Sequence, residues 1–294
     1  MDSWEEEIES ISEGNDKIII ELYTIEFPIT YCPNYFIYNN NLNFEYYHFY
    51  FNNRKREIEP KRDYYKENEN VKKIKIVIDY EVKSLALLFK ECVSIKSINF
   101  IQFNRKNVDR ILNMFEKCTN LEEINLSNFN SENINDMTNL FMDLRALKKL
   151  NLSGLNTKNV TRMEEMFKGC KSLEELDLSN FDTRNVTNMK GMFDGCISLK
   201  ELDLSSFNTE KVETMSSMFF GCSSLKKLKI SNFNTNKVKD FSHMFNKCSI
   251  LTALDISNFK LEGKNIEKMF VGIPDYLEIN IKNQNPNIKM EAFI

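Results

Sequence analysis

The chain has 294 residues, of which 42% are hydrophobic, and a formal net charge of −4. This length is enough for one or two domains with a sizeable buried core. The charge is uneven: residues 1–70 carry 15 acidic and 7 basic side chains, whereas the remainder carries 28 acidic and 32 basic ones. A nucleic-acid interface needs a clustered basic face, so this weak and mixed excess argues against nucleic acid as a partner.

Nothing in the sequence predicts a membrane span, because no apolar run reaches about 18 residues. The first residues, Met1 to Glu7, are mostly acidic. A signal peptide has the opposite character, with a basic segment followed by an apolar one. We therefore expect a cytoplasmic protein, with the cell surface as the alternative.

Residues 1–70 contain no copy of the repeat that fills the rest of the chain. Within them, Lys17 to Ile29 alternates apolar and polar residues with the spacing of a strand. Residues 31–65 are rich in Tyr, Phe and Asn. A small cap on the first repeat, an independent minidomain and partial disorder are the three interpretations. An enzyme in this segment is disfavoured by its size and by the lack of any acid–base constellation.

From residue 71 onwards the chain repeats itself every 26 residues. Phenylalanine recurs at this step at positions 89, 115, 141, 167, 193, 219 and 245. Cysteine follows three residues later at positions 92, 118, 170, 196, 222 and 248, and Leu144 is the exception. Self-similarity at a fixed period indicates a repeat architecture, in which each repeat packs on its neighbours.

Each repeat changes its hydrophobic spacing once. Leu176 and Leu178 alternate with polar residues, which is strand spacing. The later apolar residues have helical spacing; they are Val186, Met189, Met192, Phe193 and Cys196. The pair Asp182-Thr183 has the residue types that cap a helix start, and Gly195 stands where a helix end favours positive φ. We therefore predict a short strand and then a capped helix of about three turns.

Stacking such repeats predicts an α/β fold, a leucine-rich-repeat-like curved solenoid of strand–helix turns. Strands stack about 4.8 Å apart, whereas packed helices lie roughly 8–10 Å apart. This mismatch predicts that the strands line the inner, concave side. We assign residues 1–70 to a non-repeat cap or minidomain and residues 71–294 to a solenoid of about eight turns, including irregular end turns.

The repeat motif resembles the BspA-type leucine-rich-repeat family, in its Mycoplasma-lipoprotein-like variety. The residues that carry the resemblance are Ser179, Phe181, Asp182, Thr183, Val186, Met189, Met192, Phe193, Cys196 and Leu199. The resemblance covers about residues 71–281. It implies a binding role, associated with adhesion in some members, and no catalytic residues. The sequence departs from the pattern at Leu144 and Leu155, which replace Cys and Phe, and it shows no secretion signal.

The six cysteines of the repeat column are predicted to be buried packing residues rather than metal ligands or disulfides. Helices would hold neighbouring copies roughly 8–10 Å apart, whereas the Cα atoms of a disulfide lie within about 6.8 Å. The sequence has no Cys-x-x-Cys, no phosphate-binding glycine loop and no other catalytic signature. We therefore expect neither enzyme activity nor a metal or cofactor.

The exposed strand positions form the candidate binding site. With Leu176 and Leu178 facing inward, the residues beside them face the concave side. Four acids of two consecutive repeats should then lie together between lysines: Glu175, Asp177, Glu201 and Asp203, with Lys149 on one side and Lys227 and Lys229 on the other.

Like charges on adjacent strands are unfavourable, which favours a partner that offsets them. A merely solvated face and a cation site are the alternatives. The predicted function is a non-enzymatic scaffold that binds a protein through the concave sheet face. A cell-surface adhesin of the BspA-like type is the alternative function.

Overall fold

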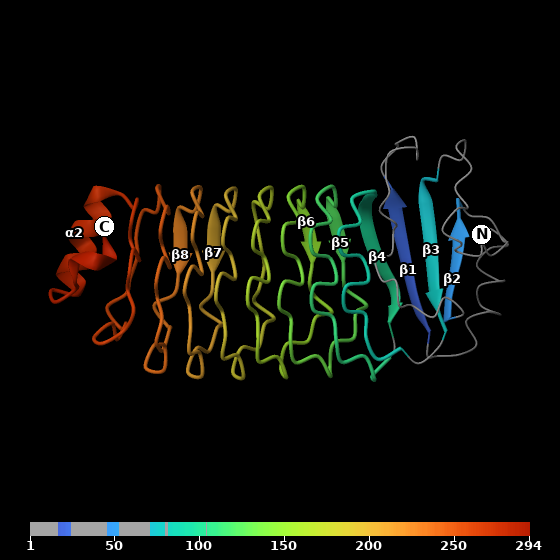
Figure 1. The fold of residues 1–294 in the computed structure, drawn as a ribbon, viewed down its shortest axis with the longest axis horizontal. Helices are drawn as coiled ribbons and strands as arrows, with labels where there is room; N and C mark the ends of the chain where they lie inside the picture. Colours follow the sequence, from blue (N-terminus) through green and yellow to red (C-terminus); the bar gives the residue numbers. More distant parts are fainter. Residues whose placement is uncertain (1–16, 25–45, 53–70, 80–81, 104) are drawn as a thin grey trace.

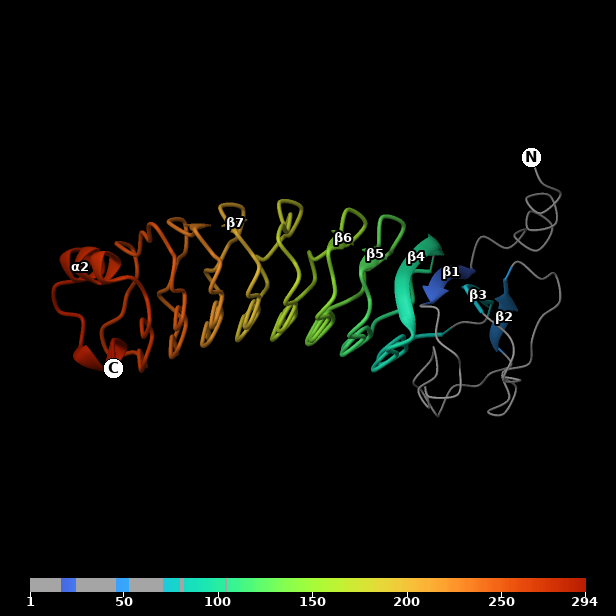
Figure 2. The same cartoon turned by 90° about the horizontal axis from the view of Figure 1, so that it is seen from above.

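The computed structural model describes residues 17–24, 46–52, 71–79, 82–103 and 105–294. They form an elongated stack of chain turns, with an antiparallel sheet at one end and helix α2 (Asp275–Gln284) at the other (Figure 1). Figure 2 shows the turns side by side along one axis. Most of the segment for which a cap, a minidomain or disorder was considered lies outside the described residues.

The sheet begins with four strands: β1 (Ile18–Thr24), β2 (Tyr47–Phe51), β3 (Lys73–Ile78) and β4 (Ile95–Phe103). β1 lies between β3 and β4 and is antiparallel to both. Its residues Ile18, Ile20 and Leu22 are fully buried, which confirms the predicted strand over the described part of 17–29. The sheet runs across the predicted boundary at residue 70, so the division into domains stays a prediction.

The repeats extend this sheet with parallel strands, β5 (Glu123–Asn125) and β6 (Lys149–Asn151). A separate two-stranded sheet follows, made of β7 (Glu201–Asp203) and β8 (Lys227–Lys229). Partners in each pair are 26 residues apart, as in Ile98 with Ile124. The predicted parallel stacking of the repeats is therefore confirmed.

The predicted helix in each repeat is wrong. Among the described residues, α2 is the one α-helix, and it lies in the last turn rather than in a repeat. The segment from Met189 to Cys196 instead forms successive tight turns. Its backbone N–H groups alternate between two kinds of acceptor: Met192 donates to Met189 O three residues back, and Phe193 donates to Met218 O in the next repeat.

Two left-handed residues in each repeat make this path possible. In one repeat they are Gly191, with a φ of 58°, and Gly195, with a φ of 71°. A residue with positive φ interrupts a right-handed helix, and glycine takes this conformation without steric cost. The prediction of positive φ at Gly195 is correct, but the helix that it would have ended does not form.

Because no helix layer is present, both sides of the stack share one spacing. The phenylalanine rings of consecutive repeats stack with their centroids 5.4–5.8 Å apart. This spacing is close to that of strands and far below the roughly 8–10 Å of packed helices. The mismatch from which we predicted a concave sheet side therefore does not arise. The argument that the cysteines stand too far apart for a disulfide also fails.

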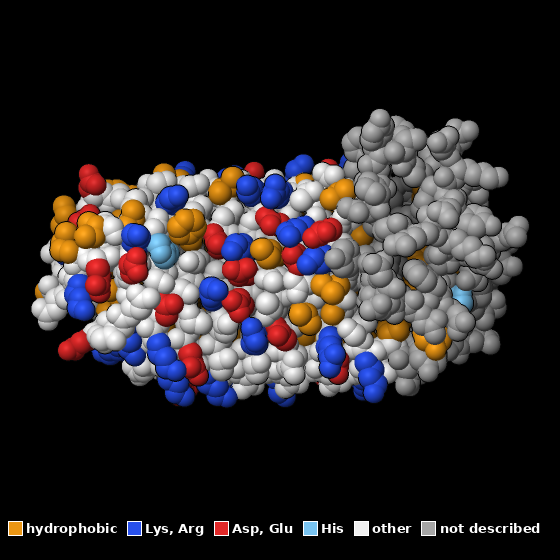
Figure 3. All heavy atoms as spheres, viewed as in Figure 1, with side chains coloured by type: hydrophobic (Ala, Val, Ile, Leu, Met, Phe, Trp, Pro, Cys, Tyr) orange, Lys and Arg blue, Asp and Glu red, His pale blue; other side chains and the backbone are white. Residues whose placement is uncertain are grey.

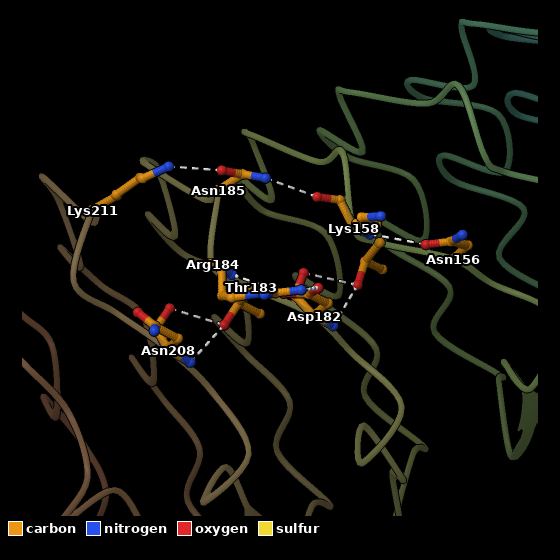
Figure 4. Close-up of polar contacts among 9 residues, drawn as sticks. Asn156, Lys158, Asp182, Thr183, Arg184, Asn185, Asn208 and Lys211 are labelled. Carbon is orange, nitrogen blue, oxygen red and sulfur yellow. Dashed lines mark hydrogen bonds and ion pairs between the residues drawn. The ribbon is translucent and has the colours of Figure 1, made fainter.

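Buried hydroxyl groups join the repeats at the corner after the strand. Thr183 is 1% exposed, and its Oγ1 donates to the Asn208 carbonyl oxygen at 2.9 Å. Thr183 Oγ1 in turn accepts a hydrogen bond from the Asn208 N–H at 2.8 Å, as Figure 4 shows. Thr157 and Asp182 repeat the arrangement one turn earlier. The threonine predicted to cap a helix thus links two repeats instead.

The last turn closes the stack with α2 and the short 3-10 helix η3 (Met290–Ala292). Leu277 and Ile281 of α2 are buried, and Phe293 stacks on Phe270 at 5.4 Å. The ring column therefore continues to the final residues. No helix of the described part is long and apolar enough to cross a membrane.

Candidate binding face

The short strands place alternate residues on the outside of the stack. In β7, Leu202 is 2% exposed, whereas the two residues beside it, Glu201 and Asp203, are exposed. In β8, Lys227 and Lys229 are exposed in the same way. Side chains alternate across a strand, so these charges share one face of the sheet. The predicted exposure of these four residues is confirmed.

Each of these acids meets a lysine from the next repeat. Lys227 Nζ lies 2.6 Å from Glu201 Oε1, and Lys229 Nζ lies 2.6 Å from Asp203 Oδ2. The hydrogen bond from Lys229 holds the pKa of Asp203 well below its ordinary value. The lysines predicted to bound an acidic block therefore neutralise half of it by direct contact.

Lys149 lies on the other side of the predicted block, but its ion pair is with a residue outside the block. Its Nζ is 3.7 Å from Glu123 Oε2 of the preceding repeat. Both side chains are exposed, so solvent screens this contact strongly. The structure thus places all seven predicted residues in neighbouring repeats, but not as one uniformly acidic patch.

The two remaining acids, Glu175 and Asp177, make no ion pair with a described residue. Asp177 accepts a hydrogen bond from the Ser179 N–H at 2.9 Å, which lowers the pKa of its carboxyl group. The hydrogen bond that Lys200 donates to Glu174 raises the pKa of Lys200, and the charge of Glu175 adds a smaller contribution. The direct contact of Lys200, however, is with Glu174. The centre of the face therefore carries two acids without a contacting cation.

The backbone at these two acids also departs from the strand pattern. Residues 173–178 are not a strand, so the strand predicted at Leu176 to Leu178 is wrong, and the sheet is interrupted between β6 and β7. The one backbone bond from this stretch to a described neighbouring repeat is Lys200 N–H to Glu174 O, at 3.2 Å. Like charges opposed on neighbouring strands disfavour pairing, and Glu175 and Asp177 face Glu201 and Asp203 in that register.

A further column of charges was missed from the sequence, directly before β5, β6, β7 and β8 and at the equivalent positions of two other repeats. It alternates in sign along most of its length: Lys96, Glu122, Lys148, Glu174, Lys200 and Lys226. Lys148 lies 3.5 Å from Glu122. The sequence contains the signal that could have identified this column, because charged residues recur there every 26 residues. In the described part of Figure 3, basic and acidic side chains are interspersed over the visible surface rather than segregated.

The cysteine column is buried, as predicted. Cys196 is fully buried, and its Sγ donates to the Phe167 carbonyl oxygen of the preceding repeat at 3.1 Å. Burial raises the pKa of this thiol to about 12. A neutral thiol is a poor nucleophile and a poor metal ligand. The described residues contain no group of three His, Cys, Asp or Glu side chains that could hold a metal ion.

A leucine-rich repeat protein from Bacteroides ovatus is similar in structure, with a TM-score of 0.37 and 16% sequence identity. The similarity covers 67% of this chain and 66% of that chain. No curated protein matches the chain by sequence.

A protein family matches the chain in two copies, over residues 83–201 and 172–284. Together the two copies span most of the described repeats and the helix α2. The chain belongs to the family described as Mycoplasma protein of unknown function, DUF285.

Proposed function

We propose that this protein is a non-enzymatic scaffold that binds a protein partner through the exposed face of its short strands. The expected contact residues are Glu175, Asp177, Glu201, Asp203, Lys149, Lys227 and Lys229. The observation that carries the proposal is the pairing pattern on this face. Glu201 and Asp203 are each held by a lysine of the next repeat, whereas Glu175 and Asp177 have no contacting cation among the described residues.

The chemistry of the face favours a partner that supplies positive charge or hydrogen-bond donors. Two neighbouring unpaired carboxylates create a local negative field, which steers a basic segment during association. The surrounding ion pairs add a fixed pattern of both signs, which selects against partners with the wrong charge order. A basic or polar protein segment is therefore the proposed occupant.

The test is the capture of partners by the full chain and by two matched double variants. Glu175→Lys with Asp177→Lys should lower the affinity for each captured partner by about tenfold or more, since each interface charge pair is worth over 1 kcal/mol. Glu132→Lys with Glu262→Lys makes the same charge change on corner residues that are exposed and away from the face. This control should leave affinity unchanged.

Binding by the unaltered chain should also weaken as salt is added, because salt screens exposed charges. Equal affinity of both double variants for every partner would show that the face is merely solvated. Folding of each variant is checked separately by its circular dichroism spectrum and unfolding midpoint.

A cell-surface adhesin is the second candidate. The resemblance of the repeat motif to the BspA-type family is the observation that favours it. Protease treatment of intact cells separates the two proposals: an adhesin is shaved from the surface, whereas a cytoplasmic scaffold is protected until the cells are lysed.

A further inference from the structure

A groove lies where the first regular repeat meets the antiparallel sheet. β4 has nine residues and pairs with β1 as far as Phe103, but it pairs with β5 only over Ser97–Asn99. Beyond Asn99, β4 continues as a strand to Phe103, whereas the equivalent residues of the next repeat, 126–129, are not strand. The resulting groove has a volume of about 730 Å³. Its lining includes Ile101, Gln102, Asn128, Asn130, Gly154 and Asn156.

The described lining of this groove contains no charged side chain, although 28% of the residues of the chain are charged. Side-chain amides and hydroxyl groups take their place. An uncharged lining offers no counter-ion to a phosphate, a carboxylate or a basic side chain. The groove is therefore suited to a neutral ligand that makes many hydrogen bonds.

The lining amides present both donors and acceptors. Asn128 Nδ2 donates to the carbonyl oxygens of Phe100 and Ile101, at 3.3 and 3.0 Å, which leaves Oδ1 as an acceptor. Asn130 Oδ1 and Asn156 Oδ1 each accept from a backbone N–H two residues later, at 3.0 Å. Their Nδ2 groups make no hydrogen bond to a described residue and are left as donors.

One wall of the groove is bare backbone. Gly154 occupies the column in which other repeats have Asn128, Asn180 and Asn232. A Cβ atom there would lie 2.3 Å from Leu126 O and 2.4 Å from Ser127 O. The repeat therefore approaches its neighbour closely at this point, and no side chain covers the polar groups beside it.

We propose that this groove binds a neutral saccharide. A sugar hydroxyl is both a donor and an acceptor, so adjacent hydroxyls match neighbouring amide groups. Ile101 is 42% exposed and offers an apolar surface to the C–H face of a sugar ring. Phe103 and Phe129 lie below and are 2% and 3% exposed. A peptide partner is disfavoured, because its anchor side chain needs an open apolar pocket.

The test uses the full chain, labelled with ¹⁵N, and methyl glycosides of glucose, galactose, mannose and N-acetylglucosamine as probes. At least one glycoside should shift the side-chain amide signals of Asn130 and Asn156 in a saturable way. Gln102→Ala and Asn156→Ala should each weaken that binding roughly three- to tenfold, the value of one hydrogen bond. Asn234→Ala is the matched control, since Asn234 Oδ1 accepts from the Asn236 N–H in the same way but outside the groove.

The proposal is overturned if no glycoside shifts the groove signals, or if Asn234→Ala weakens binding as much as Asn156→Ala. It is also overturned if an uncharged peptide probe, acetylated and amidated tri-asparagine, saturates the groove and the glycosides do not. Loss of binding in the Glu175→Lys and Asp177→Lys variant would point to the sheet face instead, because those residues do not line the groove.

Discussion

Thr183 and Asn208 form a reciprocal pair across two consecutive repeats: one hydroxyl oxygen donates to the Asn208 carbonyl and accepts from its N–H, at 2.9 and 2.8 Å. Thr183 itself is 1% exposed, and both of its hydrogen bonds to Asn208 are partly buried. The side chain therefore completes the backbone hydrogen bonding of the next repeat at a place where the strand has already ended.

Thr183→Val should lower the free energy of unfolding by about 1–3 kcal/mol, because it removes two partly buried hydrogen bonds to the backbone of Asn208, each worth about 0.5–1.5 kcal/mol. Thr183→Ser keeps the hydroxyl and should lose much less. Urea unfolding followed by circular dichroism measures both variants. The urea midpoints are compared, because the unfolding of repeat proteins is not always two-state. Equal losses for Val and Ser would mean that the hydroxyl pair contributes nothing.

Two glycines should respond differently to alanine for reasons visible in their surroundings. Gly154→Ala pushes a Cβ to within 2.3 Å of a backbone oxygen, and such overpacking should cost about 3 kcal/mol. In Gly195→Ala the added Cβ has room, since its nearest neighbouring atom would lie 3.8 Å away. The residue must still adopt a φ of 71°, which should lower the free energy of unfolding by about 1 kcal/mol. Thermal unfolding of the two variants checks the order, and a larger loss at Gly195 would contradict it.

The buried thiols should make the protein sensitive to alkali. Burial raises the pKa of Cys196 from 9.0 to about 12, so the unfolded chain releases this proton first as pH rises. The stabilising contribution is therefore complete below about pH 9 and is lost progressively between about pH 9 and 12. Urea midpoints measured across this range should fall steadily.

Cys196→Ala should lower stability by about 1 kcal/mol at neutral pH through the lost sulfur. In the alkaline range the free energy of unfolding of this variant should fall less steeply with pH than that of the unaltered chain. The difference between the two slopes should be about 1.4 kcal/mol per pH unit. Rapid labelling of Cys170, Cys196 and Cys222 by a thiol reagent in the folded protein would show that the column is not buried.

Hydrogen exchange should reveal the interruption in the sheet. Leu178 and Leu204 occupy the same position in successive repeats, and their side chains are 1% and 0% exposed. The Leu204 N–H donates to Lys229 O at 3.1 Å, whereas the Leu178 N–H has no hydrogen-bond acceptor among the described residues. The Leu178 amide should therefore exchange faster, as resolved by NMR. Equal protection of the two amides would mean that the sheet is continuous.

The 26-residue register of the sequence by itself determines much of this protein. It located the parallel strands β5 to β8, although the strand that it also predicts at Leu176 to Leu178 does not form. It also located the buried Phe, Met and Cys columns and the left-handed glycine at 195, because identical positions in stacked repeats share one environment. It also identified which residues beside Leu202 and Leu228 face outward. These properties depend on local alternation and on periodicity, both of which are written in the order of residues.

Only the tertiary structure decided how the other side of each repeat is built. The spacing of Val186, Met189, Met192 and Phe193 fits a helix and a chain of tight turns equally well, because both bury the same side chains. Hydrogen bonds from Phe193 and its equivalents to the next repeat favour the turns, and they bring the repeats to one common spacing. That spacing places Lys227 and Lys229 against Glu201 and Asp203, and leaves Glu175 and Asp177 without a contacting cation. Contacts between repeats depend on distances across the stack, which periodicity along the chain does not contain.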